Sequence, residues 1–418
     1  MPSRVRPEVC VACKGRRLLC GRAKCPILER IRAVRRLRLP GRVLEGGTPP
    51  EALVGEAGYP RVSLGPLVSE DPALPSPREM LSMGLDRIVA LRSSMVMPTV
   101  RLSVRRAESS RDLEEVRLAA MSSSPVGVEA VLRRPPRPRL DFDGVLAPVG
   151  PRAPAERVRL TEEPRVPRPV ERAVSDSDAL ASDLVVEMYE AGVDVYHSSR
   201  LLSLGALGRR GARRLVPTRW AITAVDSIVG RALKRRVLDL PEYSGPPLLY
   251  RWEFSDNRYL ILVLPGPYRL EVVEAWLSGS PWARSGVGVF SNYEGPLDDG
   301  FPVMDGGHYA MRLPVLEHMV GVGRQASVLA LREVGPGYYA PVGCWQIREA
   351  LRRAGEVRLP GGGRGGRAPG PQVRRLSPPG RVQGPERGRG AAQDLRLPLT
   401  ASATLLTLSG STLPSLFR

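Results

Sequence analysis

The sequence has 418 residues, including 42 prolines and 43 glycines, and it carries a formal net charge of +19 at pH 7. A chain of this length can form two or more domains, and its hydrophobic fraction of 42% is that of a globular protein. No run of about 18 apolar residues occurs, which excludes a transmembrane helix, and the basic stretch Met1–Arg6 leads into cysteines, which predicts no signal peptide. We therefore expect a soluble, cytoplasmic and nucleoid-associated protein with no membrane partner.

The excess of positive charge is consistent with a nucleic-acid partner, because DNA and RNA are the commonest polyanions that proteins bind. Nearly all of this charge is arginine, since lysine occurs only at Lys14, Lys24 and Lys234. A strongly GC-rich coding sequence would produce the same bias. Composition therefore permits DNA or RNA binding without establishing it.

Four of the five cysteines gather near the N-terminus, as Cys10, Cys13, Cys20 and Cys25. Four thiolates in tetrahedral geometry are typical ligands of a structural zinc ion, and a site filled by four protein ligands is closed to substrate. An iron–sulfur cluster also takes four cysteines and is the alternative metal centre. The spacing thus predicts a zinc-finger module at residues 1–39, which ends in a short amphipathic helix.

Residues 40–174 are rich in proline and glycine and predict short elements joined by loops. The alternation of Val62 and Leu64 indicates a short strand. Helices are expected over Met80–Arg92 and Asp112–Met121, with a strand over Thr99–Arg105 between them. The proline density from Arg134 to Pro169 indicates an extended connection over a surface.

Residues 175–354 form the block with the densest apolar patterning. The order of predicted elements is helix, helix, strands, helix and strand, so we expect an α/β or α+β domain with a mixed central sheet. The expected helices are 178–191, 219–236 and 309–320, and the expected strands are 248–254, 258–263, 268–273 and 327–333. Ser255–Asn257 suits a hairpin turn between the first two strands.

The stretch Arg213–Asp226 is the most informative part of this block. Pro217 disfavours a helix through Val216, and Thr218 can cap a helix that begins just after it. Trp220, Ala221, Ala224, Val225, Ile228 and Val229 recur at helical spacing and predict one buried face, with Arg219 and Asp226 outside it.

Four arginines are candidate contacts for nucleic acid or another anion. A basic loop that leads into a helix N-terminus can hold an anion, which singles out Arg213, Arg214 and Arg219. Arg324 precedes a predicted strand, where it fits DNA contact and an internal salt bridge equally well. The alternative for the first three is a solvated rim around a core helix.

Several segments in consistent order resemble the archaeal Nre family of DNA-repair proteins. The resemblance spans most of residues 8–354. Its segments are the cysteine cluster, 58–67, 215–226, 306–310, 324–326, 332–334 and 341–343. It implies an N-terminal four-cysteine zinc finger, a part in the repair of DNA damage, and docking on the sliding clamp PCNA through a short C-terminal motif. It does not decide whether the chain has an enzymatic activity.

The chain departs from this family pattern after about Ala354. Residues 355–418 are rich in arginine, glycine and proline, and this composition predicts disorder. The nearest match to the clamp motif is degenerate, because it lacks a glutamine and retains only Leu413, Leu416 and Phe417. A shifted reading frame is one hypothesis for this segment, and a native tail that binds nucleic acid is the other.

These observations favour a DNA-repair factor that acts with PCNA, on DNA, or both, with zinc as a structural element. One alternative is a metal-dependent enzyme that processes nucleic acid or nucleotides, with carboxylates such as Asp226 and Asp305 as metal ligands. The other is an RNA-binding zinc protein. No spacing in the sequence singles out catalytic residues.

Overall fold

The computed structural model describes residues 9, 12–21, 23–35, 41–49, 51–70, 75–105, 110–137, 149–280, 283, 286–298, 306–340, 342 and 344–357. The chain divides after Val357 into two units, and all of the described residues belong to the first. The predicted disordered tail, including Leu413, Leu416 and Phe417, therefore lies outside the described residues, apart from its first three residues. The predicted domain boundaries at residues 39, 174 and 354 stay predictions.

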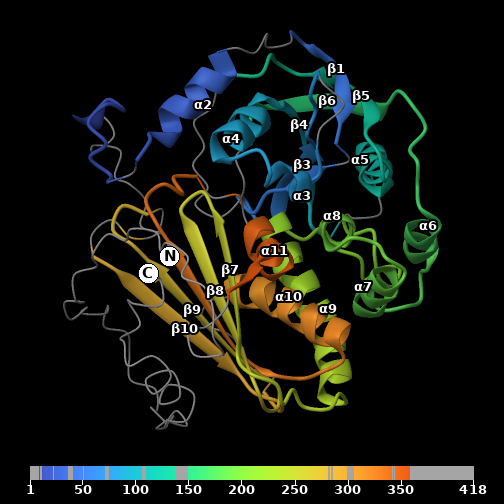
Figure 1. Cartoon of the computed structure of the whole chain (residues 1–418). Coiled ribbons are helices and arrows are strands. Elements are labelled where there is room, and N and C mark those ends of the chain that lie inside the picture. The colour runs from blue at the N-terminus through green and yellow to red at the C-terminus, as the bar shows by residue number, and fades with distance from the viewer. Residues whose placement is uncertain are drawn as a thin grey trace, which may run out of the picture. The chain divides into compact units, whose positions relative to one another are not determined.

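The first half of the chain builds a six-stranded mixed sheet with the order β1-β5-β6-β4-β3-β2 (Figure 1). Only β4 and β6 run parallel among its pairs of described strands, and the others are antiparallel. Burial along β5 alternates strictly, as expected for a strand with one face on a core. The strands are β1 (Val43–Thr48), β2 (Ala52–Val54), β3 (Arg61–Pro66), β4 (Met97–Ser103), β5 (Val126–Leu132) and β6 (Arg152–Leu160).

One face of this sheet packs against α5 (Arg111–Met121). Leu113 and Val116 of α5 share a buried core with Leu64 of β3 and Val128 of β5. The helices α2 (Pro26–Arg35) and α4 (Leu85–Ser94) pack against each other, and the short helix α3 (Pro77–Met80) precedes α4.

A second mixed sheet has the order β10-β9-β11-β8-β7-β12. In it β9 and β11 are parallel, and the other described pairs are antiparallel. The near-continuous apolar run of β8 suits a central strand whose two faces are both buried. The strands are β7 (Leu248–Phe254), β8 (Asn257–Leu264), β9 (Arg269–Trp276), β10 (Gly288–Glu294), β11 (Ser327–Val334) and β12 (Gly355–Val357).

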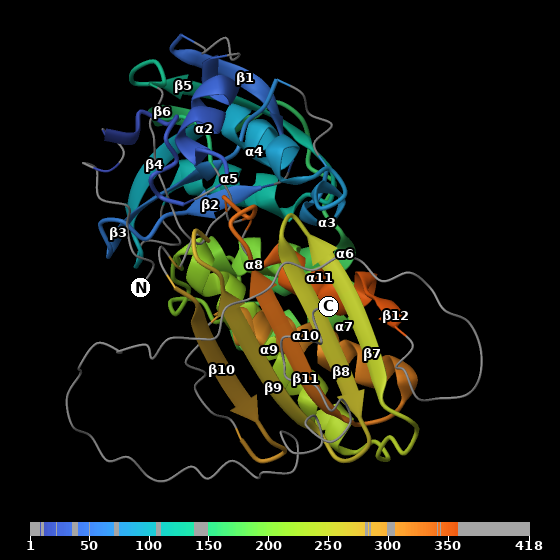
Figure 2. The same ribbon diagram turned by 60° about the vertical axis from the view of Figure 1, so that its left-hand side comes forward.

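Helices cover one face of the second sheet, as Figure 2 shows for α9, α10 and α11 behind its strands. Val225 of α9 and Leu313 of α10 share the largest core cluster with Ile261 of β8. None of the described helices combines the length and apolar character that crossing a bilayer requires. The helices of this half are α6 (Arg168–Ser175), α7 (Ala181–Glu190), α8 (Val195–Ser203), α9 (Thr218–Leu238), α10 (Gly306–Val322) and α11 (Trp345–Arg353).

The structure confirms a mixed α/β architecture and corrects several predicted elements. The helix predicted over Met80–Arg92 is split, because Gly84 has a positive φ of 78° and separates α3 from α4. The stretch predicted as an extended surface connection contains β6, an inner strand of the first sheet. Gly355–Val357, the first three residues of the segment predicted to be disordered, pair with β7 as strand β12.

Candidate nucleic-acid interface

The N-terminus of α9 is fixed by Thr218, although not in the predicted way. Thr218 is the first helical residue, and Pro217 occupies the cap position without a side-chain cap. The hydroxyl of Thr218 instead accepts a hydrogen bond of 2.8 Å from the backbone N–H of Val54 in β2. It also lies 3.0 Å from the hydroxyl of Ser203 in α8. The start of α9 is thereby held against the edge of the first sheet and against α8.

The basic segment that leads into α9 contains two arginines in different environments. The guanidinium of Arg213 donates to the backbone carbonyls of Gly208, Val174 and Asp176 at 2.7–2.9 Å. Arg213 therefore holds this loop together. Arg214 is exposed, and its hydrogen bonds to described residues go to the nearby carbonyls of Gly211 and Arg213.

Two exposed aromatic rings meet beside the start of α9. Tyr59 and Trp220 have ring centroids 5.5 Å apart and an interplanar angle of 49°. Tyr59 is 54% exposed and Trp220 is 44% exposed. The prediction that Trp220 belongs to the buried face of α9 is therefore wrong. The buried face runs through Ala221, Val225 and Val229, and Trp220 lies about 100° around the helix from Ala221.

Five exposed or partly exposed arginines lie in the segments that carry or contact this aromatic pair. Arg61, Arg101, Arg105 and Arg214 are exposed, and the partly exposed Arg219 forms an ion pair with Glu56 at 3.5 Å. We call the set of Tyr59, Trp220, Arg61, Arg101, Arg105, Arg214 and Arg219 the aromatic–arginine surface.

Backbone contacts join the three segments that carry the aromatic–arginine surface. Val104 N–H donates to the carbonyl of Pro60, and Leu215 N–H donates to the carbonyl of Val104. The Arg101 side chain lies against Gly58, where a Cβ atom would be 3.0 Å from Nη2. Gly58 also has a φ of +85°, a conformation that favours glycine. The segments 56–61, 101–105 and 213–220 thus form one continuous patch.

The fourth candidate arginine lies elsewhere. Arg324 is exposed in the turn before β11, and its neighbour Gln325 donates to the carbonyls of Leu238 and Leu240, at the C-terminal end of α9. A helix of 21 residues is about 30 Å long. The structure therefore brings Arg214 and Arg219 together and places Arg324 near the opposite end of α9.

The predicted metal module is described in part, because Cys10 lies outside the described residues. The backbone N–H of Leu19, followed by those of Gly15, Arg17 and Leu18, lowers the pKa of the Cys13 thiol, although burial alone would raise it. A ring of amides of this kind stabilises a thiolate, the form in which cysteine binds metals. Among the described residues, however, no three Cys, His, Asp or Glu side chains gather into a group that could hold a metal ion.

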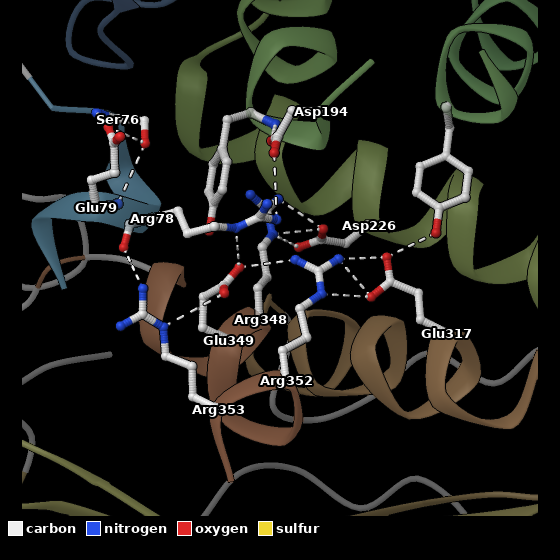
Figure 3. Close-up of polar contacts among 12 residues, drawn as sticks. Ser76, Arg78, Glu79, Asp194, Asp226, Glu317, Arg348, Glu349, Arg352 and Arg353 are labelled. Atoms are coloured by element: carbon white, nitrogen blue, oxygen red, sulfur yellow. Dashed lines mark hydrogen bonds and ion pairs between the residues drawn. The ribbon is translucent and has the colours of Figure 1, made fainter. Parts of the chain in front are cut away.

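Asp226 lies in a fully buried ion pair, contrary to its predicted position outside the buried face of α9. Arg348 Nε donates to both carboxylate oxygens at 2.9 and 3.2 Å, and Nη2 lies 2.7 Å from Oδ1 (Figure 3). Burial opposes the charge of Arg348, but Asp226 raises the pKa of the guanidinium above its ordinary value. Asp226 is thus occupied by arginine and is not presented to a ligand, and Asp305 lies outside the described residues.

Further ion pairs of α11 extend this network towards the surface (Figure 3). Arg78 of α3 donates to Glu349 at 3.0 Å, and Arg352 donates to Glu317 of α10 at 2.6 Å. Tyr189 of α7 donates to the same Glu317. Helix α11 therefore connects elements from both halves of the chain. No local pattern in the sequence predicts these contacts, because the partners are distant along the chain.

A second buried network surrounds Glu294. Its carboxylate lies 3.0 Å from Nε2 of His308, 3.1 Å from Nη1 of Arg312 and 3.0 Å from Nζ of Lys234. Burial alone would raise the pKa of Glu294, but these three neighbours lower it to about 2. His308 therefore takes part in a buried structural network.

Comparison with known families decides the relationship of this chain to other proteins. The family described as archaeal Nre, N-terminal, matches residues 19–283, and the family described as archaeal Nre, C-terminal, matches residues 296–359. The chain belongs to the archaeal Nre family. The N-terminal match includes every residue of the aromatic–arginine surface but begins after Cys10 and Cys13. The C-terminal match includes Arg348.

Relatives of the Nre family cover most of the chain. The DNA repair protein NreA of Archaeoglobus fulgidus is 39% identical over 82% of this chain and 88% of the relative. The DNA repair protein NreB of the same organism is 34% identical over 82% and 87%. The DNA repair protein NreA of Haloferax volcanii is 37% identical over 76% and 79%. No solved structure matches the chain significantly.

Proposed function

We propose that this chain is a DNA-repair protein that contacts DNA directly through the aromatic–arginine surface. Its relatives in the Nre family are named DNA repair proteins. The observation that carries the proposal is the exposed pair Tyr59 and Trp220, with six arginines and a single glutamate, Glu56, in the three segments around it.

The charges of this surface fit a phosphate backbone. Arginine binds phosphate through several donors in a fixed planar arrangement, and each neutralised phosphate releases condensed counterions. Arg61, Arg101 and Arg105 come from neighbouring strand ends of the first sheet, and Arg214 and Arg219 come from the start of α9. A DNA backbone that crosses this patch would meet arginines from the segments that carry each of the two rings.

The test is DNA binding by the full chain across a salt series, with two matched arginine variants. Arg101→Ala should weaken binding and lower the slope of log affinity against log salt by about 1, as expected for one lost phosphate contact. Arg324→Ala removes another exposed arginine, near the other end of α9, and should leave both quantities unchanged. Equal effects of the two variants would reject this surface as the contact.

We further propose that Cys10, Cys13, Cys20 and Cys25 bind a structural zinc ion, with an iron–sulfur cluster as the alternative. The support is the spacing of the thiols and the ring of amides around the sulfur of Cys13. The proposed zinc ion is structural and not catalytic, because four protein ligands would fill its coordination sphere.

Docking on the sliding clamp PCNA remains a proposal that rests on the family resemblance. The residues that would dock, Leu413, Leu416 and Phe417, lie outside the described residues. Binding of the full chain to purified PCNA, compared with a Phe417→Ala variant, tests it directly. Equal binding by both proteins would remove this motif from the proposal.

A further inference from the structure

The aromatic–arginine surface offers ring faces as well as charge. An exposed fraction near one half leaves about one face of each ring, Tyr59 and Trp220, open to solvent. In duplex DNA the faces of the bases are covered by their neighbours, and proteins reach only base edges and phosphates. Open aromatic faces are instead the feature by which proteins bind single strands, whose unstacked bases can stack on them.

The geometry of the pair favours stacking on the outside of the rings. A base between two aromatic rings needs about 3.4 Å on either side, the stacking distance in DNA, whereas these ring centroids are only 5.5 Å apart and the rings are tilted by 49°. The two rings therefore support each other, and bases can add only to their outer faces.

Both rings are mounted on ordered backbone. Tyr59 N–H donates to the carbonyl of Glu56, and Arg61 N–H donates to the carbonyl of Gly58, so the chain around Tyr59 is a hydrogen-bonded turn. Trp220 lies in the first turn of α9, which Thr218 fixes to Val54. Pre-positioned rings lose little conformational entropy when a ligand binds.

We propose that this surface recognises unpaired bases in DNA, with Tyr59 and Trp220 as stacking residues and the arginines as contacts to the phosphates on either side. The inference rests on the proposed function and names its ligand. It assigns the chain to repair intermediates that expose single-stranded DNA.

The experiment compares a single-stranded oligodeoxynucleotide of about 16 nucleotides with a duplex of the same sequence, both titrated with the full chain. Trp220→Ala should weaken single-strand binding by about 5- to 150-fold, as expected for loss of one stacked base, and should leave the salt slope unchanged. Duplex binding should change little. Tyr293→Ala removes an aromatic ring that is also 44% exposed, on β10, and should have no effect.

A Trp220→Phe variant distinguishes the loss of stacking from a folding defect, because a smaller aromatic ring should restore much of the single-strand affinity. Equal binding of both DNA forms, or equal losses in Trp220→Ala and Tyr293→Ala, would overturn the inference and leave DNA binding itself in place. Absence of binding to either form would overturn the proposed function. Tighter binding of an RNA strand of the same sequence would overturn the assignment to DNA.

Discussion

Asp226 of α9 and Arg348 of α11 form an ion pair from which solvent is almost completely excluded. Asp226 is 0% exposed and Arg348 is 1% exposed, and the guanidinium also lies 4.7 Å from the centre of the Tyr196 ring. Removal of one partner from such a pair leaves an uncompensated charge in the core. We therefore expect changes at Asp226 to act first on the stability of the fold.

Asp226→Ala should lower the free energy of unfolding by about 3–5 kcal/mol, because it leaves the buried charge of Arg348 without its partner. The double variant Asp226→Ala with Arg348→Met should be less destabilised than the single variant, since it removes both charges. Denaturant unfolding measures both. Glu190→Ala, which breaks an exposed pair with Arg236, is the control and should change stability by less than about 1 kcal/mol. If Asp226→Ala lost no more stability than the Glu190→Ala control, the structural role of Asp226 would be contradicted.

Arg213 and Arg214 are adjacent and should behave differently. Arg213→Ala removes hydrogen bonds to three backbone carbonyls and should cost about 1–3 kcal/mol of stability. Arg214→Ala should leave stability nearly unchanged and weaken DNA binding. Thermal unfolding and DNA titration on both variants separate the two roles. Equal effects of the two variants on stability and on DNA binding would show that Arg213 does not hold this loop together.

His197 should make stability depend on pH in the mildly acidic range. Burial, with a further contribution from the charge of Arg200, lowers its pKa from 6.5 to about 3. Below pH 6.5 the unfolded chain binds a proton that the folded chain does not, so this contribution to stability is present above pH 6.5 and is lost as the pH falls towards 3. The loss approaches about 1.4 kcal/mol per pH unit for one proton.

Unfolding in denaturant at a series of pH values tests this prediction on wild type and His197→Asn. The wild type should lose stability steadily below about pH 6.5, and the variant should show a flatter profile over the same range. Parallel profiles for the two proteins would assign the pH dependence to other groups.

The metal proposal predicts about one zinc ion per chain after purification, measured by elemental analysis. Cys20→Ser should lower that content, whereas Cys344→Ser should not, because Cys344 is the N-cap residue of α11 and belongs to no metal-binding group among the described residues. Iron and inorganic sulfide in place of zinc would identify the cluster alternative. A chain that carries neither metal would reject the module.

Local patterns in the sequence were enough to predict β7, β8, β9 and β11 of the second sheet, but not its two edge strands β10 and β12. The strand predicted over Leu248–Phe254 is β7, and the turn predicted at Ser255–Asn257 joins it to β8. Apolar runs and the turn residues between them identify these elements in the sequence. By contrast, β6 lies in a proline-rich stretch, where Pro154 cannot donate a hydrogen bond but still accepts one from Arg133 N–H.

The candidate site was predicted only in part, since it depends on contacts between distant segments. Arg214, Arg219 and Gly58–Pro60 were each noted in the sequence, but no local pattern shows that Tyr59 meets Trp220. Helical spacing also placed Trp220 on the wrong face of α9 and Asp226 outside the buried one. A buried carboxylate follows from its partner Arg348, which comes from another helix, and not from its own neighbours in sequence.

The most direct test of the central claim is hydrogen–deuterium exchange of the full chain with and without single-stranded DNA. We expect slower exchange in residues 56–61, 101–105 and 213–220 when DNA is bound, with no change in the turn around Arg324. Protection that appears elsewhere and leaves these three segments unchanged would contradict it.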